Sequence, residues 1–229
     1  QVPLLRYNEK MWGDGIDNQV STSASFNLGK KATLSVWVIP NRITAAEGDT
    51  DRIGIIGSQY YSSGQFHLGI HDSSRRIFWS ATNATSGYWD LSASQFDIGK
   101  LSHLCLVYDT SQTGNAGKDS SKLYVNGVYA GASVAGSQST TDLQCTNFNI
   151  GDTNQQEFSG LIDEVSIWNH AFSATEIQEL FSDGVALNAT THSKAGNLLG
   201  YWRNDGISSW TDRRGWSYLD FDGSSDEVT

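Results

Sequence analysis

Carboxylates outnumber cationic side chains, because the 229-residue chain carries 25 Asp and Glu against 15 Lys and Arg. A glycoside hydrolase needs two carboxyl groups side by side, one of them kept protonated by an apolar pocket. The run Glu47-Gly-Asp-Thr-Asp51 is typical of an exposed turn, which supplies no such pocket. Asp163 and Glu164 are consecutive in a strand-like run, which would place them on opposite faces of a strand. Glycoside hydrolysis is therefore the least favoured function.

The two cysteines and five histidines form no recognisable catalytic or metal-binding motif. His103 lies two residues before Cys105, but nothing else in the sequence supports a catalytic thiol. Cys105 and Cys145 are expected either to form one disulfide bridge or to be two buried free thiols. His67 and His71 are four residues apart on a strand, which is too far for one zinc ion.

The net charge of −10 argues against nucleic acid as a partner, because few cationic side chains are present to displace counterions from a phosphate backbone. No apolar run reaches the roughly 18 residues that a membrane-spanning helix needs. The start of the chain also lacks the charged and apolar parts of a secretory signal. It opens at Gln1 rather than Met, as a processed or excised product would. We therefore expect no nucleic acid partner and no membrane insertion.

Short apolar runs separated by turn residues predict many β-strands. Residues 32–39 alternate apolar and polar side chains up to Pro40, and Asn126-Gly127 between two apolar runs predicts a hairpin with a type I′ turn. The remaining strands are expected at 52–57, 65–70, 76–79, 101–108, 147–150 and 160–168. Many short strands without alternating helices predict an all-β fold, a β-sandwich or jelly roll.

One helix is expected after these strands. Ser173-Ala-Thr-Glu176 is a capping box, and Ile177, Leu180 and Phe181 form one apolar stripe behind it. Gly184 stands where a left-handed residue would end the helix. We expect a short surface helix that covers one face of the sandwich.

The domain boundary is predicted near residue 192, so that 1–192 form the sandwich and 193–229 a C-terminal segment. Residues 219–228 weakly repeat the pattern of residues 12–20, as the start of a following module would. The alternative is that this segment is a closing strand of the same sandwich. We favour the closing strand, because half a module could not bury its own apolar face.

The order of these motifs resembles the laminin G-like branch of the concanavalin A-like lectin/glucanase superfamily. The resemblance covers residues 11–185, and the motifs that carry it are Asp14-Gly15 to Val20, 32–38, 101–109, 123–127, 160–171 and the capping box. It implies a two-sheet antiparallel jelly roll with one short surface helix. The segment 200–206 resembles the strand that usually opens such modules, but here it follows the helix.

The resemblance also implies a calcium ion, held by the acidic residue of the last long strand and by groups near the first strand. These map onto Asp163 and onto Asp14, Asp17 and Asn18. Calcium takes six to eight oxygen ligands, which Asp and Asn side chains and glycine-rich turns can provide. The alternative is that the first-strand residues only cap their own turns. A second acidic loop, with Glu47, Asp49 and Asp51, is expected to be a solvated turn.

Lectin sites of this family combine an aromatic ring, which stacks on a sugar, with Asp, Asn and backbone donors. The expected site lies between Asn83 and Asp90, with Tyr88 and Trp89 as the stacking platform, Asn83 and Asp90 as polar partners and Trp79 nearby. The alternative is that one ring of the adjacent pair belongs to the core and the other is only partly exposed.

These features predict a non-enzymatic binding module on the outside of a cell or virion, which recognises a glycan or a glycosylated surface with the help of calcium. The alternative is a structural or decoration protein of a virion or extracellular fibre, in which the sandwich contacts like subunits. The low content of charged residues, 17%, fits that alternative. Because this fold supports lectins, enzymes and scaffolds, the functional prediction rests partly on analogy.

Overall fold

The computed structural model describes most of the chain. The described residues are 11–14, 20–22, 24–43, 52–58, 65–71, 75–81, 85–135, 142–151, 158–203, 209–212 and 216–220.

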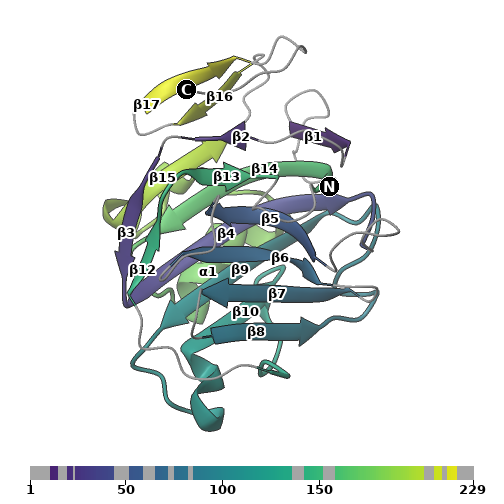
Figure 1. Ribbon diagram of the computed structural model, residues 1–229, viewed down its shortest axis with the longest axis vertical. Helices are drawn as coiled ribbons and strands as arrows, with labels where there is room; N and C mark the ends of the chain where they lie inside the picture. Colours follow the sequence, from purple (N-terminus) through teal and green to yellow (C-terminus); the bar gives the residue numbers. More distant parts are fainter. Residues whose placement is uncertain are drawn as a thin grey trace.

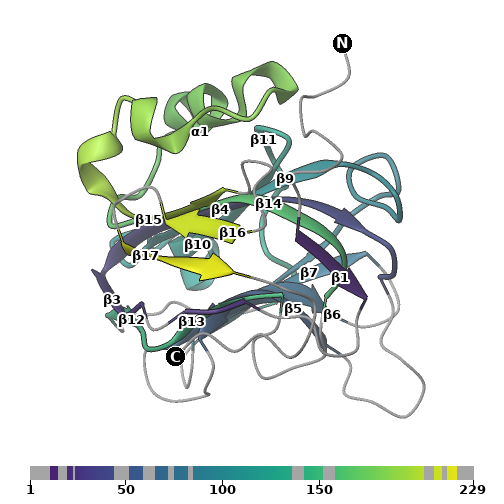
Figure 2. The ribbon, with the colours of Figure 1, turned by 90° about the horizontal axis from the view of Figure 1, so that it is seen from above.

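The strands among these residues form two large antiparallel sheets that pack face to face (Figure 1, Figure 2). The larger sheet has the order β11 (Val128–Tyr129), β10 (Ser121–Val125), β9 (Ser102–Asp109), β4 (Lys31–Pro40), β14 (Ser159–Trp168), β15 (Leu198–Arg203), β16 (Ser209–Asp212) and β17 (Trp216–Asp220), and β1 (Met11–Asp14) also pairs with β14. The smaller sheet has the order β2 (Val20–Ser21), β13 (Phe148–Ile150), β5 (Arg52–Ser58), β6 (Phe66–His71), β7 (Arg76–Ala81) and β8 (Thr85–Asp90). A short pair, β3 (Phe26–Gly29) and β12 (Leu143–Cys145), lies beside them. The predicted jelly-roll sandwich is confirmed.

The core lies between the sheets because the side chains of each strand alternate. In β4, the even-numbered residues from Ala32 to Val38 belong to the core, where they meet apolar side chains of the smaller sheet such as Ile70 and Ile77. The odd-numbered residues of β4 face the other side of the larger sheet. Burial of these apolar surfaces is the main source of stability of the sandwich.

The outer side of the larger sheet is covered by the predicted helix, α1 (Ala174–Phe181), as Figure 2 shows. Both halves of the capping box are present, since the Glu176 amide donates to Ser173 Oγ at 3.3 Å and the Ser173 amide donates to Glu176 Oε2 at 2.7 Å. The side chains of Ile177 and Leu180 are buried against the sheet. The helix ends earlier than predicted, because Ser182 already adopts a left-handed conformation, two residues before Gly184.

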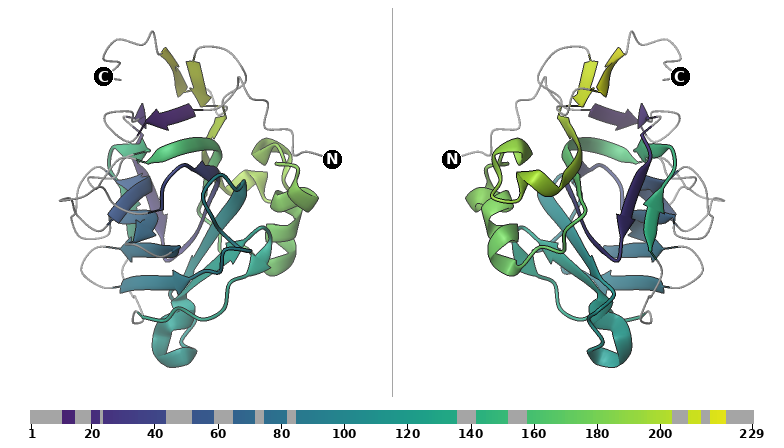
Figure 3. Two further views of the ribbon diagram at one scale, coloured as in Figure 1. Left: turned by 90° about the vertical axis from the view of Figure 1, so that its right-hand side faces the viewer. Right: turned by 90° about the vertical axis from the view of Figure 1, so that its left-hand side faces the viewer.

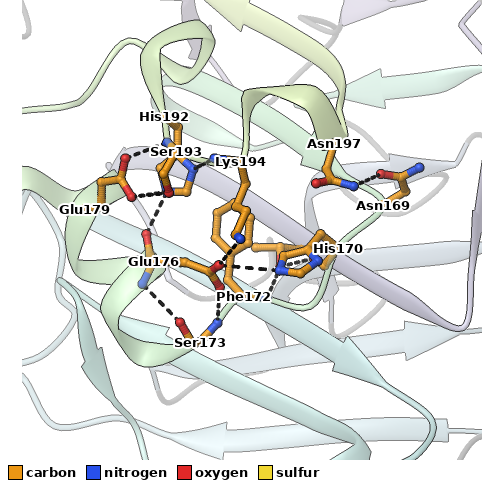
Figure 4. A network of polar contacts seen from close by, with 11 residues as sticks. Asn169, His170, Phe172, Ser173, Glu176, Glu179, His192, Ser193, Lys194 and Asn197 are labelled. Carbon is orange, nitrogen blue, oxygen red and sulfur yellow. Dashed lines mark hydrogen bonds and ion pairs between the residues drawn. The ribbon is translucent and has the colours of Figure 1, made fainter.

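A polar network holds α1 to the chain that follows it, the short 3₁₀ turns η3 (Ala189–Thr191) and η4 (Ala195–Asn197) (Figure 4). Lys194 Nζ lies 3.2 Å from Glu176 Oε1, and Ser193 donates to Glu179 through both its amide and its hydroxyl. The buried ring of His192 stacks on Phe172 at 4.7 Å. The Lys194 amide donates to Nδ1 of this ring at 3.0 Å, so Nε2 carries the proton that is shared with the Glu176 carbonyl at 2.9 Å.

The first part of the C-terminal segment is a strand of the same sandwich. β15 pairs with β14 through Val165↔Trp202 and its neighbours, and the ring of Trp202 belongs to the core. Figure 3 shows β16 and β17 beyond it at one end of the sandwich. Among the described residues, no helix has the length and apolar character that a membrane span requires.

Candidate functional site

A groove runs along the outer side of the larger sheet, between the β10–β11 hairpin and the start of α1. It consists of two adjoining hollows of about 550 and 470 Å³ that share Asp119, Lys122, Tyr124 and Ala174. β10 forms its floor, because Ser121, Leu123 and Val125 point to the core and leave Lys122 and Tyr124 on the outer side. The 3₁₀ turn η1 (Asn115–Ser120) and β11 complete the walls. We call this feature the Tyr124 groove.

Two tyrosine rings lie side by side in the groove. The Asn126-Gly127 turn, with positive φ at both residues as predicted, places Tyr124 directly opposite Tyr129 in the hairpin. The ring centroids are 5.5 Å apart and the planes are inclined by 49°. Tyr129 is 42% exposed and the neighbouring Val128 is 65% exposed, so the hairpin offers an apolar surface to the solvent. Burial raises the pKa of both tyrosine hydroxyl groups, which therefore stay protonated donors.

The rim of the groove is polar. Asp119 accepts a hydrogen bond from Asn115 Nδ2 at 2.9 Å. Lys122 makes no ion pair with any residue that the structure describes. Gln178 of α1 donates from Nε2 to the Gly127 carbonyl at 2.6 Å, so the helix is tied directly to the hairpin turn. The groove thus combines an aromatic surface with a carboxylate, an ammonium group and amides.

The other carboxylates of the groove already have partners. Asp109 is partly buried, but hydrogen bonds from Ser111 and the ammonium group of Lys31 at 3.2 Å outweigh burial and lower its pKa. Glu176 is likewise held ionised against burial by Ser173, Lys194 and His170, with a lowered pKa. Neither residue therefore resembles the protonated acid that glycoside hydrolysis needs.

The structure corrects the predicted stacking platform. Residues 85–90 form strand β8, whose alternation turns Trp89 into the core and leaves Tyr88 and Asp90 outside. Trp89 is 1% exposed and donates from Nε1 to the Gly131 carbonyl, while Trp79 is 0% exposed beside Phe66. Neither tryptophan can offer a ring face to a sugar. The alternative, in which one ring of the adjacent pair is core, is the one observed; Asn83 lies outside the described residues.

Two of the four predicted calcium ligands, Asp14 and Asp163, lie among the described residues. Asp14 pairs with Ser159 in the β1–β14 ladder, four residues from Asp163, which corresponds to about 13 Å along the strand. Oxygen ligands of one calcium ion lie within about 2.6 Å of it, so these two residues are too far apart. Asp163 is 4% exposed and its Oδ1 accepts the Glu164 amide at 2.8 Å. No group of three or more His, Cys, Asp or Glu suited to a metal occurs in the described part of the chain; Asp17, Asn18 and the loop with Glu47, Asp49 and Asp51 lie outside it.

A β-bulge overturns the expectation that Asp163 and Glu164 point to opposite faces. The β14–β4 register shifts between Asp163 and Ser166, and Glu164 has a φ of 51°. Asp163 stands opposite Trp37, which packs under α1, and Glu164 reaches Tyr201 and Arg203 on the same outer face. Glu164 accepts the Tyr201 hydroxyl and pairs with Arg203 Nε at 2.9 Å. The bulge thus pairs a buried carboxylate, Glu164, with the partly exposed Arg203.

The two cysteines are free and buried, as one of the two expectations had it. Burial raises the pKa of both thiols, that of Cys145 to about 12, so neither is a thiolate at neutral pH. They therefore act as small apolar side chains.

Sequence reasoning missed the Tyr124 groove, although the sequence carried a signal for it. The alternation of the predicted hairpin already places Lys122, Tyr124 and Tyr129 on one face. What the sequence could not show was that α1 packs beside this face and forms the second wall.

Comparisons with known proteins agree with the observed fold. A family model described as the concanavalin A-like lectin/glucanases superfamily matches residues 14–178. Among solved structures, the chain is similar to a heptameric SAP-like pentraxin from Limulus polyphemus, with 14% identity, a TM-score of 0.58 and coverage of 75% of this chain and 81% of the pentraxin. It is also similar to a putative carbohydrate binding protein from Bacteroides ovatus, with 17% identity, a TM-score of 0.58 and coverage of 87% of this chain and 54% of that protein. A comparison with curated proteins finds no match.

Proposed function

The chain belongs to the concanavalin A-like lectin/glucanase superfamily, and from this we propose that it is a non-enzymatic, extracellular carbohydrate-binding module that holds a sugar in the Tyr124 groove. The adjacent rings of Tyr124 and Tyr129 carry the proposal. An aromatic ring packs against the C–H face of a sugar, and the polar groups around it fix the orientation of the hydroxyl groups. Asp119, Lys122 and Gln178 provide acceptors and donors of this kind.

The size and charge of the groove support the same ligand class. Its larger hollow, of about 550 Å³, is within the range of about 300–1,000 Å³ that is usual for small-molecule sites. Asp109 and Glu176 are paired with Lys31 and Lys194, and the other charged residues of its described lining are Asp119 and Lys122, so the groove is close to neutral. Neutral sugars are therefore favoured over polyanionic glycans.

The fold alone would not distinguish a binding module from an enzyme. The Bacteroides protein is described as a putative carbohydrate binding protein, which agrees with the proposal. The partners of Asp109 and Glu176 argue further against hydrolysis, because both carboxylates are kept ionised.

Calcium remains a separate proposal, because Asp17 and Asn18 lie outside the described residues. The groove itself needs no ion, so we expect glycan binding there to persist in EDTA. If calcium binds the native chain elsewhere, it should raise the melting midpoint by mass action. An unchanged melting midpoint at saturating calcium would contradict the proposal that the chain binds calcium.

The test of the function is glycan binding by the native chain and by Tyr124→Ala. A glycan array identifies the bound sugar, and isothermal titration then compares the variants. We expect Tyr124→Ala to weaken binding by about tenfold or more, because ring stacking and the hydroxyl donor are both lost. Ile98→Ala, which removes an exposed apolar side chain that does not line the groove, is the control and should bind normally. Equal binding by both variants would contradict the proposal.

The structural alternative is favoured by one observation, the exposed edge strand β11 with Val128 and Tyr129. An exposed edge can pair with a second chain. In a decoration protein, Val128→Lys would abolish self-association measured by sedimentation. A monomeric chain that binds glycans would exclude this role for β11.

A further inference from the structure

We infer that Arg52 and Tyr88 form a second binding site, on the outer face of the smaller sheet, for one oxyanion group, a carboxylate or a sulfate, carried by a saccharide. That a saccharide carries the anion rests on the proposed function, whereas the oxyanion specificity rests on the geometry of this site alone.

The sheet register gathers charged residues in one row. Arg52 of β5 pairs with His71 of β6, His71 pairs with Arg76 of β7, and Arg76 pairs with Asp90 of β8. The chain neighbours of these residues, Ile53, Ile70 and Ile77, are buried between the sheets. Because side chains alternate along a strand, the charged row lies on the outer face. In a chain with a net charge of −10, a row with two arginines is a local exception.

Tyr88 pairs with Phe78 in the neighbouring row, and its side chain contacts the charged row. Arg52 Nη2 donates to the Tyr88 hydroxyl at 3.4 Å, the His71 ring meets the Tyr88 ring at 5.0 Å, and the Arg76 guanidinium lies 5.8 Å from its centroid. One face of the Tyr88 ring is thus occupied by Arg76, which makes the predicted sugar stacking on this ring unfavourable. The hydroxyl accepts from Arg52, so its own proton is directed elsewhere.

The two arginines differ in their partners. Arg76 donates two hydrogen bonds to Asp90, from Nε at 2.5 Å and from Nη2 at 3.1 Å, so the charge of Asp90 is neutralised by Arg76. Arg52 makes no ion pair with a carboxylate among the described residues. Its guanidinium lies 5.3 Å from the Phe78 ring centroid, which fixes its position without neutralising it.

This arrangement is suited to one oxyanion. A guanidinium carries five N–H donors, of which Arg52 uses one on Tyr88. Arg52 is partly exposed, and its other donors have no hydrogen-bond partner among the described residues. The phenolic hydroxyl of Tyr88 is a further donor next to the guanidinium. The net negative charge of the chain disfavours a polyanion. The site therefore fits a single carboxylate or sulfate on an otherwise neutral sugar.

The test uses methyl glucuronide and a sulfated methyl glycoside as probes, with methyl glucoside, acetate and inorganic sulfate as comparisons. Binding is followed by NMR titration of the full chain. Arg52→Gln removes the guanidinium, and Arg52→Lys keeps the charge but loses the planar donors, which covers the case that the first variant folds poorly. Lys30→Gln is the matched control, because Lys30 is an exposed cation in the turn before β4.

We expect one of the anionic glycosides to bind more tightly than methyl glucoside, and Arg52→Gln to weaken it by about tenfold or more. Lys30→Gln should bind it like the native chain. Equal losses in Arg52→Gln and Lys30→Gln would overturn the proposal, because only net charge would then matter. Equal affinity for acetate, inorganic sulfate and the glycosides would overturn the assignment to a saccharide. If Tyr124→Ala no longer binds the neutral ligand, that loss reports on the Tyr124 groove and not on the Arg52 site. Binding of the anionic ligand should be unaffected by Tyr124→Ala.

Discussion

Gly127 is restricted by its backbone and by its neighbours at the same time. Its φ is +74°, and a Cβ would lie 2.7 Å from Gln178 Nε2 and 2.9 Å from Phe181 Cδ1. The residue therefore allows both the hairpin turn and the close approach of α1, which together form the Tyr124 groove.

Gly127→Ala should destabilise the protein by more than the cost of a left-handed residue, which is about 1–2 kcal/mol. Gly131 is the matched control, since its φ is +95° but a Cβ at this position would meet no atom within 4 Å. Urea denaturation of Gly127→Ala and Gly131→Ala separates backbone strain from the clash. A Gly131→Ala variant that loses as much stability as Gly127→Ala would show that the contact with α1 contributes nothing.

Trp89 shows why the site could not be read from residue types alone. An aromatic pair next to Gly87 and Asp90 is typical of a surface loop, but the same residues alternate as a strand, with Trp89 inward and Tyr88 outward. The period-two pattern over residues 85–90 is too short to identify the strand from the sequence. Burial in the folded protein decides which of the two rings is available to a ligand.

At the level of elements, the strands with long alternation and the capped helix were predictable, because local pattern and tertiary packing agree there. β4, the 121–129 hairpin and α1 all lie where their sequences indicate. The bulge at Glu164 was not predictable, because it depends on the partners Tyr201 and Arg203, which lie in a different strand. The Tyr124 groove was missed for the same reason, since it needs the docking of α1 on the hairpin.

The capping box of α1 should make stability depend on pH through Glu176. Its pKa is lowered in the folded protein, although burial opposes this, by Ser173, Lys194 and His170. A carboxyl with a depressed folded pKa stabilises the fold above its unfolded pKa of about 4.3, and this contribution is lost as the pH falls through the folded value.

Glu176→Gln keeps a side-chain acceptor for the capping box but removes the carboxylate charge, so it should lower the free energy of unfolding at pH 7 by roughly 0.3–1 kcal/mol. The difference from the native chain should shrink as the pH falls below about 4, where Glu176 itself becomes protonated. Urea denaturation at pH 7 and pH 3 measures this. A difference that stays constant between the two pH values would contradict the ionic role of Glu176.

At the level of the whole molecule, the C-terminal segment and the sandwich are one packed unit as far as β15. The Trp202 ring is 2% exposed and stacks on Phe148 of the smaller sheet at 4.8 Å between centroids. Both sheets therefore contribute to the environment of a residue that follows the helix in sequence.

Trp202→Ala should cost about 3–5 kcal/mol of unfolding free energy, because a buried aromatic side chain is lost from the core. Val128→Ala, at an exposed position, should change it by less than about 0.5 kcal/mol. Both are measured by urea denaturation of the full chain. A small effect of Trp202→Ala would mean that β15 belongs to a following module rather than to this core.

The central claim is that a sugar binds on the outer side of the larger sheet without being cleaved. Its most direct measurement is an NMR titration of the isotopically labelled chain with the best glycan from the array, followed by analysis of the recovered glycan. The account predicts that the largest shift changes fall on Lys122, Tyr124, Tyr129 and Gln178, and that the glycan is recovered intact. Shift changes confined to the smaller sheet, or a glycan shortened by hydrolysis, would contradict it.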